Sequence, residues 1–261
     1  MKDTIQEVST DNEQLQSDNK NVIIDINNLE VTFGTVSILK GVTLKLYEGE
    51  NLVILGKSGS GKSVLIKCIV SLLNSTGGSI EVFGENINKL DRHGLSEMRK
   101  KIGFLFQSGA LYDSMTVKQN LEFVLKRIKR KLKQKEIDEQ IIEVLENVGL
   151  ANSIDKMPSE LSGGMRKRIS LARTIIVNPL IMLYDEPTTG LDPLTSDEIS
   201  ALINKVQEKY KTSSMIITHD INCVRETADR ILMLQDGVIY MEGNLKDYET
   251  SRDPLIQAFF K

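Results

Sequence analysis

The stretch GKSGSGKS, Gly56–Ser63, decides the fold that this sequence predicts. It fits the pattern G-x-x-x-x-G-K-[ST] and lies between the apolar run NLVIL and the apolar segment Val64–Leu73, which we interpret as a buried strand and a helix. Glycines let the backbone wrap around phosphate groups, and N–H groups at a helix N-terminus attract negative charge. We therefore predict a phosphate-binding loop here; the alternative is a loop that merely joins two elements.

Individual residues of this loop have predicted roles. Lys62 would reach the β- and γ-phosphates of a bound nucleotide, and the hydroxyl of Ser63 would be a ligand of Mg²⁺. The phosphates would be bound by the loop as a whole, which comprises Gly56, Ser58, Gly59, Ser60, Gly61, Lys62 and Ser63.

A pair of acids follows another predicted buried strand, in LIMLYDEP, Leu180–Pro187. Asp185 suits the ligand shell of Mg²⁺, and Glu186 has the chemistry to polarise a water molecule for attack on the γ-phosphate. Taken alone, two adjacent acids at a strand end indicate a solvated turn as often as a catalytic site. The phosphate loop in the same chain favours the catalytic interpretation.

Strands alternate with helices along the chain, which predicts an α/β fold with a mostly parallel sheet and ligands at the carboxyl ends of its strands. Before the phosphate loop we expect three strands, in NVIIDI, LEVTF and SILKGVTLKL, separated by turn-forming Asn-Asn and Gly residues. Near the end, SSMIITHD is typical of a buried strand and DRILMLQDGVIYMEG of a hairpin.

The segment from about Ser108 to Met165 predicts a helical subdomain inserted into the α/β core. Thr116 and Gln119 resemble a capping box that opens a helix over 117–129. A second helix follows, which Gly149 can end. Its apolar residues recur on one face, at Ile137, Ile141, Val144, Leu145 and Val148.

We expect four parts along the chain. Residues 1–22 are polar and predict a disordered tail. Residues 23–107 hold an antiparallel β part and the phosphate loop of a nucleotide-binding core. The helical subdomain takes residues 108–165, and residues 166–261 complete the core and form a C-terminal tail.

Composition and charge narrow the class of protein. Of 261 residues, 40% are hydrophobic and 26% charged, which is ordinary for a soluble globular protein. A net charge of -3 argues against a nucleic-acid partner. Cys68 and Cys223 are too few for a disulfide framework or a zinc site, which favours a reducing cytosol. No apolar run approaches the roughly 18 residues that cross a bilayer, so another chain would supply any membrane spans.

Together the motifs resemble the nucleotide-binding subunit of an ABC transporter, over nearly the whole chain after the tail. The resemblance implies a P-loop NTPase fold of the ABC type, with ATP and Mg²⁺ as cofactors. In that family the serine and two glycines of a signature loop bind the γ-phosphate of ATP held by the opposite subunit. In LSGGMRKRIS, Leu161–Ser170, these are Ser162, Gly163 and Gly164. A second copy of the chain is therefore an expected partner, in a nucleotide-sandwich homodimer.

Four further residues match motifs of this family in order. Gln107, in GFLFQS, matches the glutamine that senses Mg²⁺ and the attacking water. Asp192, in TTGLDP, matches the aspartate that communicates across the dimer. His219, in IITHD, matches the switch histidine that contacts the γ-phosphate, and Phe33, in VTFG, matches the aromatic residue that stacks on adenine. Alone, each residue has an ordinary structural interpretation; their joint order carries the resemblance.

The signature loop departs from the commonest family pattern at Met165, where glutamine is usual. Neutral drift is one explanation. However, LSGGMRKRISLART and LFQSGALYDSMTV closely resemble the ATPases that work with MCE-type proteins in lipid transport across the bacterial envelope, and DPLIQAFFK resembles that branch's short C-terminal tail. This branch implies phospholipid as cargo, and a multi-span permease and an MCE-domain protein as partners. It also implies a cytoplasmic protein, peripheral on the inner membrane.

The run KRIKRKLKQK, Lys126–Lys135, places seven basic residues in what we expect to be one helical stretch. Such a run is usually a solvated face. The alternative is a position near anionic lipid headgroups, because the helical subdomain docks beneath the permease in the family. Nothing aromatic is interleaved with these charges, so a nucleic-acid role is poorly supported.

Other functions stay open on the sequence alone. The ATPase could drive a different importer or exporter, such as one for amino acids. A soluble ABC protein acting on ribosomes or DNA usually carries two cassettes or a long coiled-coil insertion, and neither is seen. Intact Glu186 and His219 weigh against a regulatory module that holds ATP without hydrolysing it.

Overall fold

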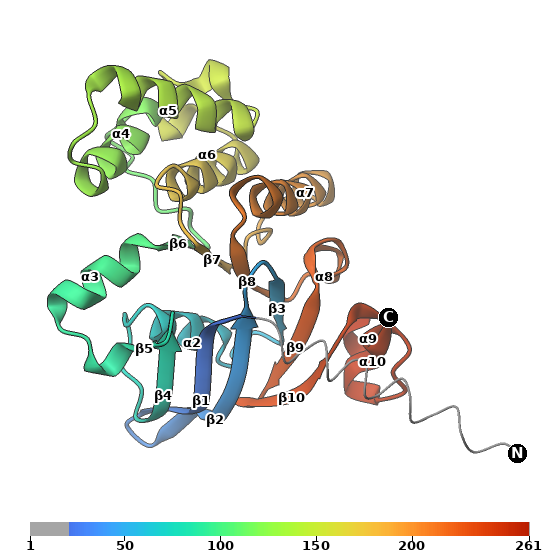
Figure 1. Cartoon of the computed structure of the whole chain (residues 1–261). Helices are drawn as coiled ribbons and strands as arrows, with labels where there is room; N and C mark the ends of the chain where they lie inside the picture. The colour runs from blue at the N-terminus through green and yellow to red at the C-terminus, as the bar shows by residue number, and fades with distance from the viewer. Residues whose placement is uncertain (1–20, 261) are drawn as a thin grey trace, which may run out of the picture.

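The structure, a computed structural model, describes residues 21–260 and contains two sheets. The predicted disordered tail therefore lies, but for its last two residues, outside the described residues. The smaller sheet is antiparallel and four-stranded, as Figure 1 shows at the lower left. Its strand order is β2 (Val36–Tyr47), β1 (Val22–Phe33), β4 (Gly77–Val82) and β5 (Glu85–Asn86).

The larger sheet has six strands and matches the predicted mostly parallel α/β core. All neighbouring strands in it pair in parallel except β9 with β10, which form the predicted terminal hairpin. Its order is β10 (Val238–Gly243), β9 (Arg230–Gln235), β3 (Asn51–Leu55), β8 (Ser213–Thr218), β7 (Ile181–Asp185) and β6 (Ile102–Leu105).

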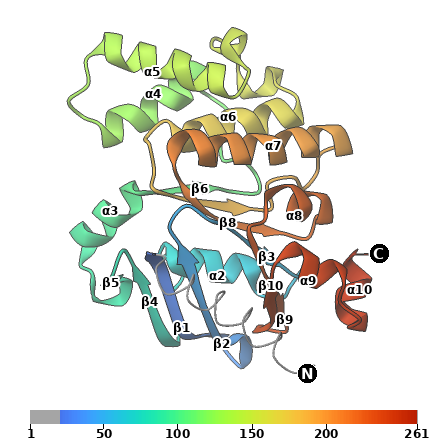
Figure 2. The ribbon, with the colours of Figure 1, turned by 45° about the vertical axis from the view of Figure 1, so that its right-hand side comes forward.

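The helices cover this sheet and form a separate layer beyond its β6 edge (Figures 1 and 2). The longer ones are α2 (Lys62–Ile69), α3 (Arg92–Lys100), α4 (Val117–Ile128), α5 (Gln134–Asn147), α6 (Gly163–Ile175) and α7 (Pro193–Tyr210). The short ones are α8 (Ile221–Thr227), α9 (Leu245–Glu249), α10 (Pro254–Phe260) and the 3₁₀ turns Ile87–Lys89, Ala151–Ser153 and Pro158–Glu160.

The helix ends in the inserted segment follow the predicted signals. The Thr116 hydroxyl accepts a hydrogen bond from the N–H of Gln119, and the Gln119 side chain accepts one from the N–H of Thr116. This capping box opens α4 as expected. After α5 the chain turns at Gly149, whose φ of 70° is a left-handed conformation that glycine adopts without a steric penalty.

Three sequence predictions about individual elements were wrong. Two strands were expected before Phe33, but β1 runs through Asn28 as one strand, since a β-bulge absorbs this residue at φ 48° and its N–H donates to Thr43 Oγ1. The helix expected over 64–73 ends at Ile69, and Ser71 turns the chain at φ 53°. The basic run 126–135 is not one helical stretch, because residues 129–133 connect α4 to α5.

The core fills both sides of the six-stranded sheet. Leu52 and Ile54 of β3 pack into one cluster with the antiparallel sheet and α2, whereas Val53 and Leu55 pack into the other with the helical layer. Successive side chains of a strand point to opposite faces, so a fully buried parallel strand reads as a continuous apolar run. Rigid strands buried on both faces fix the positions of the polar loops that follow them.

Candidate nucleotide site

The phosphate loop turns from β3 into α2, and glycine has a structural reason at two of its positions. A Cβ on Gly56 would lie 2.4 Å from the carbonyl oxygen of Leu234. Gly61 has a φ of 105°, and a Cβ there would lie 2.7 Å from Leu39 Cδ2. Close approach to a backbone oxygen thus requires glycine at position 56, and the backbone conformation favours it at position 61.

The loop closes around Lys62, which is 5% exposed. Its Nζ donates to the carbonyl oxygens of Gly56 at 2.7 Å and Lys57 at 3.0 Å, and lies 3.6 Å from Glu186 Oε1. Burial lowers the pKa of Lys62, and the neighbouring Glu186 carboxylate opposes that shift. The ammonium group is therefore held inside the loop beside a carboxylate.

Ser63 and Asp185 meet at the start of α2. The Ser63 hydroxyl donates to Asp185 Oδ1 at 2.9 Å, and Asp185 is the last residue of β7. These oxygens suit Mg²⁺, which takes oxygen ligands and usually keeps one or two carboxylates together with water and phosphate oxygens. In the described part of the chain, no three His, Cys, Asp or Glu side chains form a metal-holding group.

Glu186 follows directly and is held from several sides. His219 Nδ1 lies 2.8 Å from Glu186 Oε2, and the Thr189 hydroxyl donates to the same oxygen at 3.1 Å. The backbone of Glu186 has a φ of 51°, a sparsely populated region for a residue other than glycine. The N–H of Glu186 donates to the carbonyl of Ile217. The buried carboxylate is thus fixed in direction beside a cation and an imidazole.

Gln107 follows β6 and is joined to Glu186 by a lysine that has no sequence-predicted role. Lys167, on α6, is 7% exposed; its Nζ donates to the carbonyl oxygens of Gln107 at 2.6 Å and Glu186 at 3.3 Å. Burial lowers the pKa of Lys167. The sequence indicates Lys167 only by its place in the basic start of a helix, because its two partners are distant in the sequence.

A cavity of about 600 Å³ brings half of the predicted residues together. It is lined by Lys57, Ser58, Gly59, Gly61, Lys62 and Ser63 of the loop and by Gln107, Glu186 and His219. Apolar lining comes from Ile38, Val64 and Phe259, and Phe259 is not among the predicted site residues. Phe33, predicted to stack on adenine, is 49% exposed at the end of β1 and is not among the lining residues.

The signature loop is also outside this cavity. Ser162 caps α6, its hydroxyl accepting from the N–H of Met165, and Ser162 and Gly163 are exposed. A Cβ on Gly164 would lie 2.4 Å from Thr195 Cγ2, so glycine permits the close packing of α6 on α7. Met165 is half-buried against the apolar cluster of the helical layer rather than projecting from the loop.

Asp192 is exposed as well, at the N-terminus of α7. It accepts hydrogen bonds from the Thr195 hydroxyl at 2.6 Å and the Thr195 N–H at 3.0 Å. These bonds hold the pKa of the Asp192 carboxyl below its usual range. Within one chain, then, the phosphate loop, Glu186, Gln107 and His219 share a cavity. Asp185 lies behind it, bonded to Ser63, whereas the signature loop and Asp192 lie elsewhere on the surface.

The chain is similar to a known family and to several known proteins. A family model described as "ABC transporter" matches residues 39–189. The probable ribonucleotide transport ATP-binding protein mkl of Mycobacterium bovis is 40% identical over 238 residues; the match covers 91% of this chain and 66% of that protein. The chain thus spans slightly less than two thirds of the mycobacterial relative's length.

Two other relatives match over similar lengths. The Arabidopsis thaliana protein TRIGALACTOSYLDIACYLGLYCEROL 3, chloroplastic, is 35% identical over 91% of this chain and 73% of its own length. The methionine import ATP-binding protein MetN of Brucella abortus is 35% identical over 92% of this chain and 64% of its own length.

Solved structures share the fold. The ATP-binding cassette MJ0796, in a dimeric post-hydrolysis state with ADP and Pi, has a TM-score of 0.78 at 34% identity, over 85% of this chain and 99% of that one. The cbiO1 protein of Clostridium perfringens has a TM-score of 0.82 at 28% identity, over 92% and 95%. The chain belongs to the ABC transporter family, as an ATP-binding cassette with a P-loop NTPase fold.

Proposed function

We propose that this protein hydrolyses ATP and thereby drives a separate membrane permease. The observation that carries the proposal is the setting of Glu186, a buried carboxylate 3.6 Å from Lys62 and 2.8 Å from His219 in the cavity of the phosphate loop. A carboxylate fixed in direction at the end of a phosphate site suits a general base that accepts a proton from an attacking water.

Other residues of the cavity would support the same reaction. The loop amides and Lys62 would stabilise the negative charge that develops as the phosphoryl group is transferred. Mg²⁺ held by Ser63 and Asp185, with Gln107 nearby, would supply further neutralisation of phosphate charge. His219 would orient the Glu186 carboxylate and contact the γ-phosphate.

The proposed base is tested by Glu186→Gln, which keeps the shape of the side chain and removes its basicity. We expect ATP turnover to fall by at least about 100-fold while an ATP-bound dimer accumulates, detected by light scattering. Glu208→Gln, at an exposed position of α7, is the matched control and should turn over normally. Full activity of Glu186→Gln would refute the assignment of the base.

We propose a homodimer because part of the expected site is missing from each chain. Ser162, Gly163 and Asp192 are exposed and do not line the cavity, so a second copy would bring its signature loop to the phosphates. The related cassette MJ0796 is described as dimeric with ADP and Pi, which supports the same geometry here. Phe33, exposed at the end of β1, stays a candidate for contact with adenine.

For the cargo we propose phospholipid, moved across a bacterial envelope by a permease together with an MCE-domain protein. The resemblance of the signature segment and the C-terminal tail to that branch supports it, as does a relative named for a galactolipid. In the described residues no helix is long and apolar enough to cross a membrane, and we place the protein peripherally on the cytoplasmic face of the inner membrane.

An amino-acid importer is the second candidate, favoured by the similarity to a methionine import protein. Affinity purification from the native membrane in detergent separates the two. We expect a multi-span permease and an MCE-domain protein to copurify. Recovery of an importer permease with a solute-binding protein would overturn the lipid proposal and leave ATP hydrolysis intact.

A further inference from the structure

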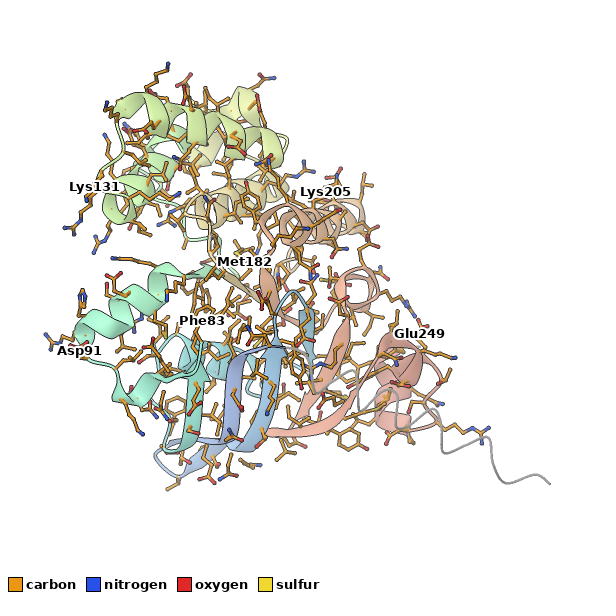
Figure 3. The ribbon with its side chains drawn as sticks, in the orientation of Figure 1. Phe83, Asp91, Lys131, Met182, Lys205 and Glu249 are labelled. Atoms are coloured by element: carbon orange, nitrogen blue, oxygen red, sulfur yellow. The ribbon has the colours of Figure 1, made fainter. Side chains whose placement is uncertain are left out.

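Two neighbouring strands, β7 and β8, carry Glu186 and His219 at their ends. The strands pair in parallel, with Asp185 opposite Ile217, so the loops that follow them leave the sheet at the same edge. Figure 3 shows Met182 of β7 near the centre of the molecule, and its side chain is fully buried. The strands therefore fix where both loops begin, but they leave open where the two side chains point.

The imidazole of His219 is only partly packed. Its side chain is 56% exposed, and it lines both the nucleotide cavity and a second cavity of about 380 Å³. The second cavity lies between the turn 188–191 and the N-terminal end of α8, where Asp220 and Asn222 contribute to the lining. The direction of the ring toward Glu186 therefore depends on hydrogen bonds and on the backbone that carries the ring.

Asp220 joins the two loops through its carboxylate. Its Oδ2 accepts a hydrogen bond at 2.8 Å from the hydroxyl of Thr188, which lies two residues after Glu186. Its Oδ1 accepts from two backbone N–H groups at the start of α8, at 3.0 and 3.4 Å. The N–H of Asp220 donates to the Thr218 hydroxyl at 3.0 Å. The residue beside His219 is thus tied to its own strand, to the helix that follows and to the loop of Glu186.

The turn after Glu186 is linked to the His219 loop at two points. Thr188 is buried, so its hydroxyl cannot exchange Asp220 for water unless the turn moves. The next residue, Thr189, donates to Glu186 Oε2, the same oxygen that lies 2.8 Å from His219 Nδ1. The contact between Glu186 and His219 is therefore supported from behind by the bond between Thr188 and Asp220.

The contact also assigns a proton on the imidazole. An ionised carboxylate only accepts hydrogen bonds, so the His219 Nδ1 that lies 2.8 Å from Glu186 Oε2 carries a proton. A neutral ring turned away from Glu186 would be free to carry its proton on Nε2 instead. The position of this proton therefore reports whether the two loops are held together.

We propose that Asp220 is a positioning residue, which acts through its bond to Thr188 to hold the imidazole of His219 against the Glu186 carboxylate. The proposal deepens the proposed function, since it rests on Glu186 and His219 serving ATP hydrolysis. Neither Asp220 nor Thr188 lines the nucleotide cavity, so their loss should affect the rate of the chemical step rather than the binding of ATP.

The first test compares Thr188→Val, which keeps the shape of the side chain and removes the donor, with Thr227→Val. Both threonines are 4% exposed, and the Thr227 hydroxyl donates to the carbonyl of Cys223 within α8 at 2.7 Å. The control thus removes a matched bond that joins no two loops. Imidazole ¹⁵N chemical shifts of the ATP-free protein distinguish a protonated Nδ1 from a protonated Nε2. Thr188→Val should move the His219 Nδ1 signal toward that of an unprotonated nitrogen, and Thr227→Val should not.

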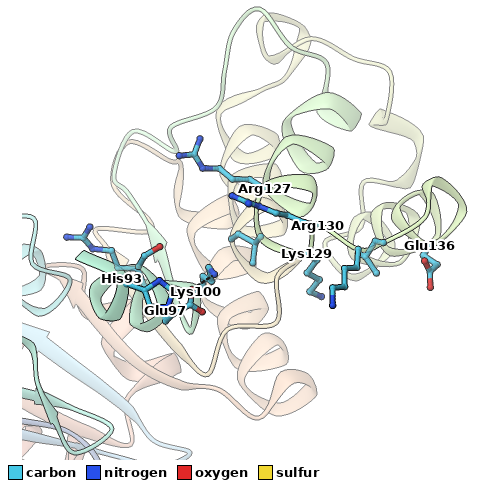
Figure 4. A pocket seen from close by; sticks show the side chains of 12 residues that line it. His93, Glu97, Lys100, Arg127, Lys129, Arg130 and Glu136 are labelled. Carbon is cyan, nitrogen blue, oxygen red and sulfur yellow. Dashed lines mark hydrogen bonds and ion pairs between the residues drawn. The ribbon is translucent and has the colours of Figure 1, made fainter. Parts of the chain in front are cut away.

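His93 is the internal reference for these spectra, because the sequence contains two histidines. It lies on α3, in the cavity between α3 and the α4–α5 connection, as Figure 4 shows. That cavity shares no lining residue with the nucleotide cavity or with the cavity beside Asp220. The His93 signals should therefore be the same in every variant, and His93→Gln assigns them.

ATP turnover supplies the second measurement. Thr188→Val should lower kcat about tenfold and leave KM within about twofold, because a misdirected group weakens the transition state more than substrate binding. Thr188→Ser keeps the donor and should restore both kcat and the His219 spectrum. Asp220→Asn keeps one oxygen for two sets of donors, so it should change kcat and the spectrum in the same direction as Thr188→Val.

Three results would overturn the proposal. The first is a His219 spectrum that Thr188→Val leaves unchanged. The second is an equal loss of kcat in Thr188→Val and Thr227→Val, and the third is a Thr188→Ser variant that restores neither measurement; both would indicate a structural role alone. The spectra are recorded without ATP, so they test the bond between the loops separately from hydrolysis, which Glu186→Gln tests.

Discussion

The phosphate loop and the signature loop both place glycines at the start of a helix, yet their surroundings differ. Lys62, at the first position of α2, is 5% exposed and donates to two carbonyls of its own loop. Ser162, which caps α6, is exposed on the surface. The phosphate loop encloses its own lysine side chain, although Lys57, Ser58 and Gly59 are exposed, whereas the serine of the signature loop is open to solvent.

The difference extends to the acids beside each loop. Asp185 and Glu186 are buried and contact the phosphate-loop side chains Ser63 and Lys62. Asp192 is exposed and is satisfied by its own helix through Thr195. A site with one enclosed half and one open half becomes complete when a two-fold axis brings the open half of a second copy to it.

The largest effect is expected from the enclosed half. Lys62→Ala removes the cation beside Glu186 and the donor to the carbonyls of Gly56 and Lys57. ATP turnover should fall about 1,000-fold, because charge on the transferred phosphoryl group loses a pre-positioned partner. Steady-state phosphate release measures it. Lys67→Ala, on the same helix, is the matched control, and a Lys62 variant that kept a tenth of the activity would contradict the assignment.

A substitution in the open half should lower ATP turnover nearly as much, but it should not change the binding of ATP by a single chain. Ser162→Ala should lower turnover about 100-fold, by loss of one donor to the phosphate of the opposite subunit. Loss of the helix cap should also cost about 1 kcal/mol of unfolding free energy. Equilibrium binding of ATP by the monomer should be unchanged, and a parallel loss of monomer affinity would place Ser162 in the wrong half.

Mixing the two inactive variants sharpens the comparison. In a dimer of one Lys62→Ala chain and one Ser162→Ala chain, one composite site keeps both an intact lysine and an intact serine. About a quarter of wild-type turnover should therefore return in an equal mixture, if chains pair at random and sites act independently. No recovery would mean that both residues serve the same chain's site.

A smaller effect is expected at the lysine that links the two halves. Lys167 lies on the signature helix but donates to Gln107 and Glu186 in the cavity. Lys167→Met leaves two buried carbonyls with a partner fewer, which should cost about 1–3 kcal/mol of unfolding free energy. Turnover should fall about tenfold as Gln107 and Glu186 lose a fixed position, with little change in ATP affinity.

The neighbouring Arg168 supplies the control for Lys167. It pairs with Glu198 at the surface, and Arg168→Met should change stability by less than about 1 kcal/mol. Urea unfolding and kcat measured on both variants decide the point. If Lys167→Met lost stability but kept its kcat, the lysine would be a structural group without a positioning role.

Local spacing explains what the sequence could predict. The phosphate loop, the acid pair at the end of β7, the capping box of α4 and the terminal hairpin each depend on residues a few positions apart. Their chemistry is therefore visible in a short window. The α/β alternation likewise predicts a mostly parallel sheet.

Contacts between segments that are distant in the sequence explain the features that could not be predicted. Lys167 is 60 positions from Gln107, and neither residue type alone signals the other. Phe259 reaches the cavity from the C-terminal helix, whereas the expected aromatic, Phe33, stays outside it. Asn28 could end a strand or sit in a bulge, and pairing with β2, which offers Thr43, selects the bulge.

The smallest predicted effect concerns the hydrogen bonds that Asp192, in the open half, accepts from Thr195. The Thr195 hydroxyl donates to Asp192 and holds its pKa low, while Thr195 Cγ2 packs near Gly164. Thr195→Val keeps the shape and removes the donor, so the pKa of Asp192 should rise toward its ordinary range. The backbone bond from residue 195 would keep it partly lowered. Carboxyl chemical shifts followed through an acid titration measure the change.

The sign of the pH effect follows from the direction of this shift. A carboxyl whose folded pKa is lowered stabilises the protein above its unfolded pKa of about 3.9, and that contribution is lost as the pH falls through the folded value. The wild type should therefore be slightly more stable to urea than Thr195→Val at pH 7, and the difference should vanish in strong acid. A difference that persisted in acid would show that the threonine acts through packing on Gly164 rather than through Asp192.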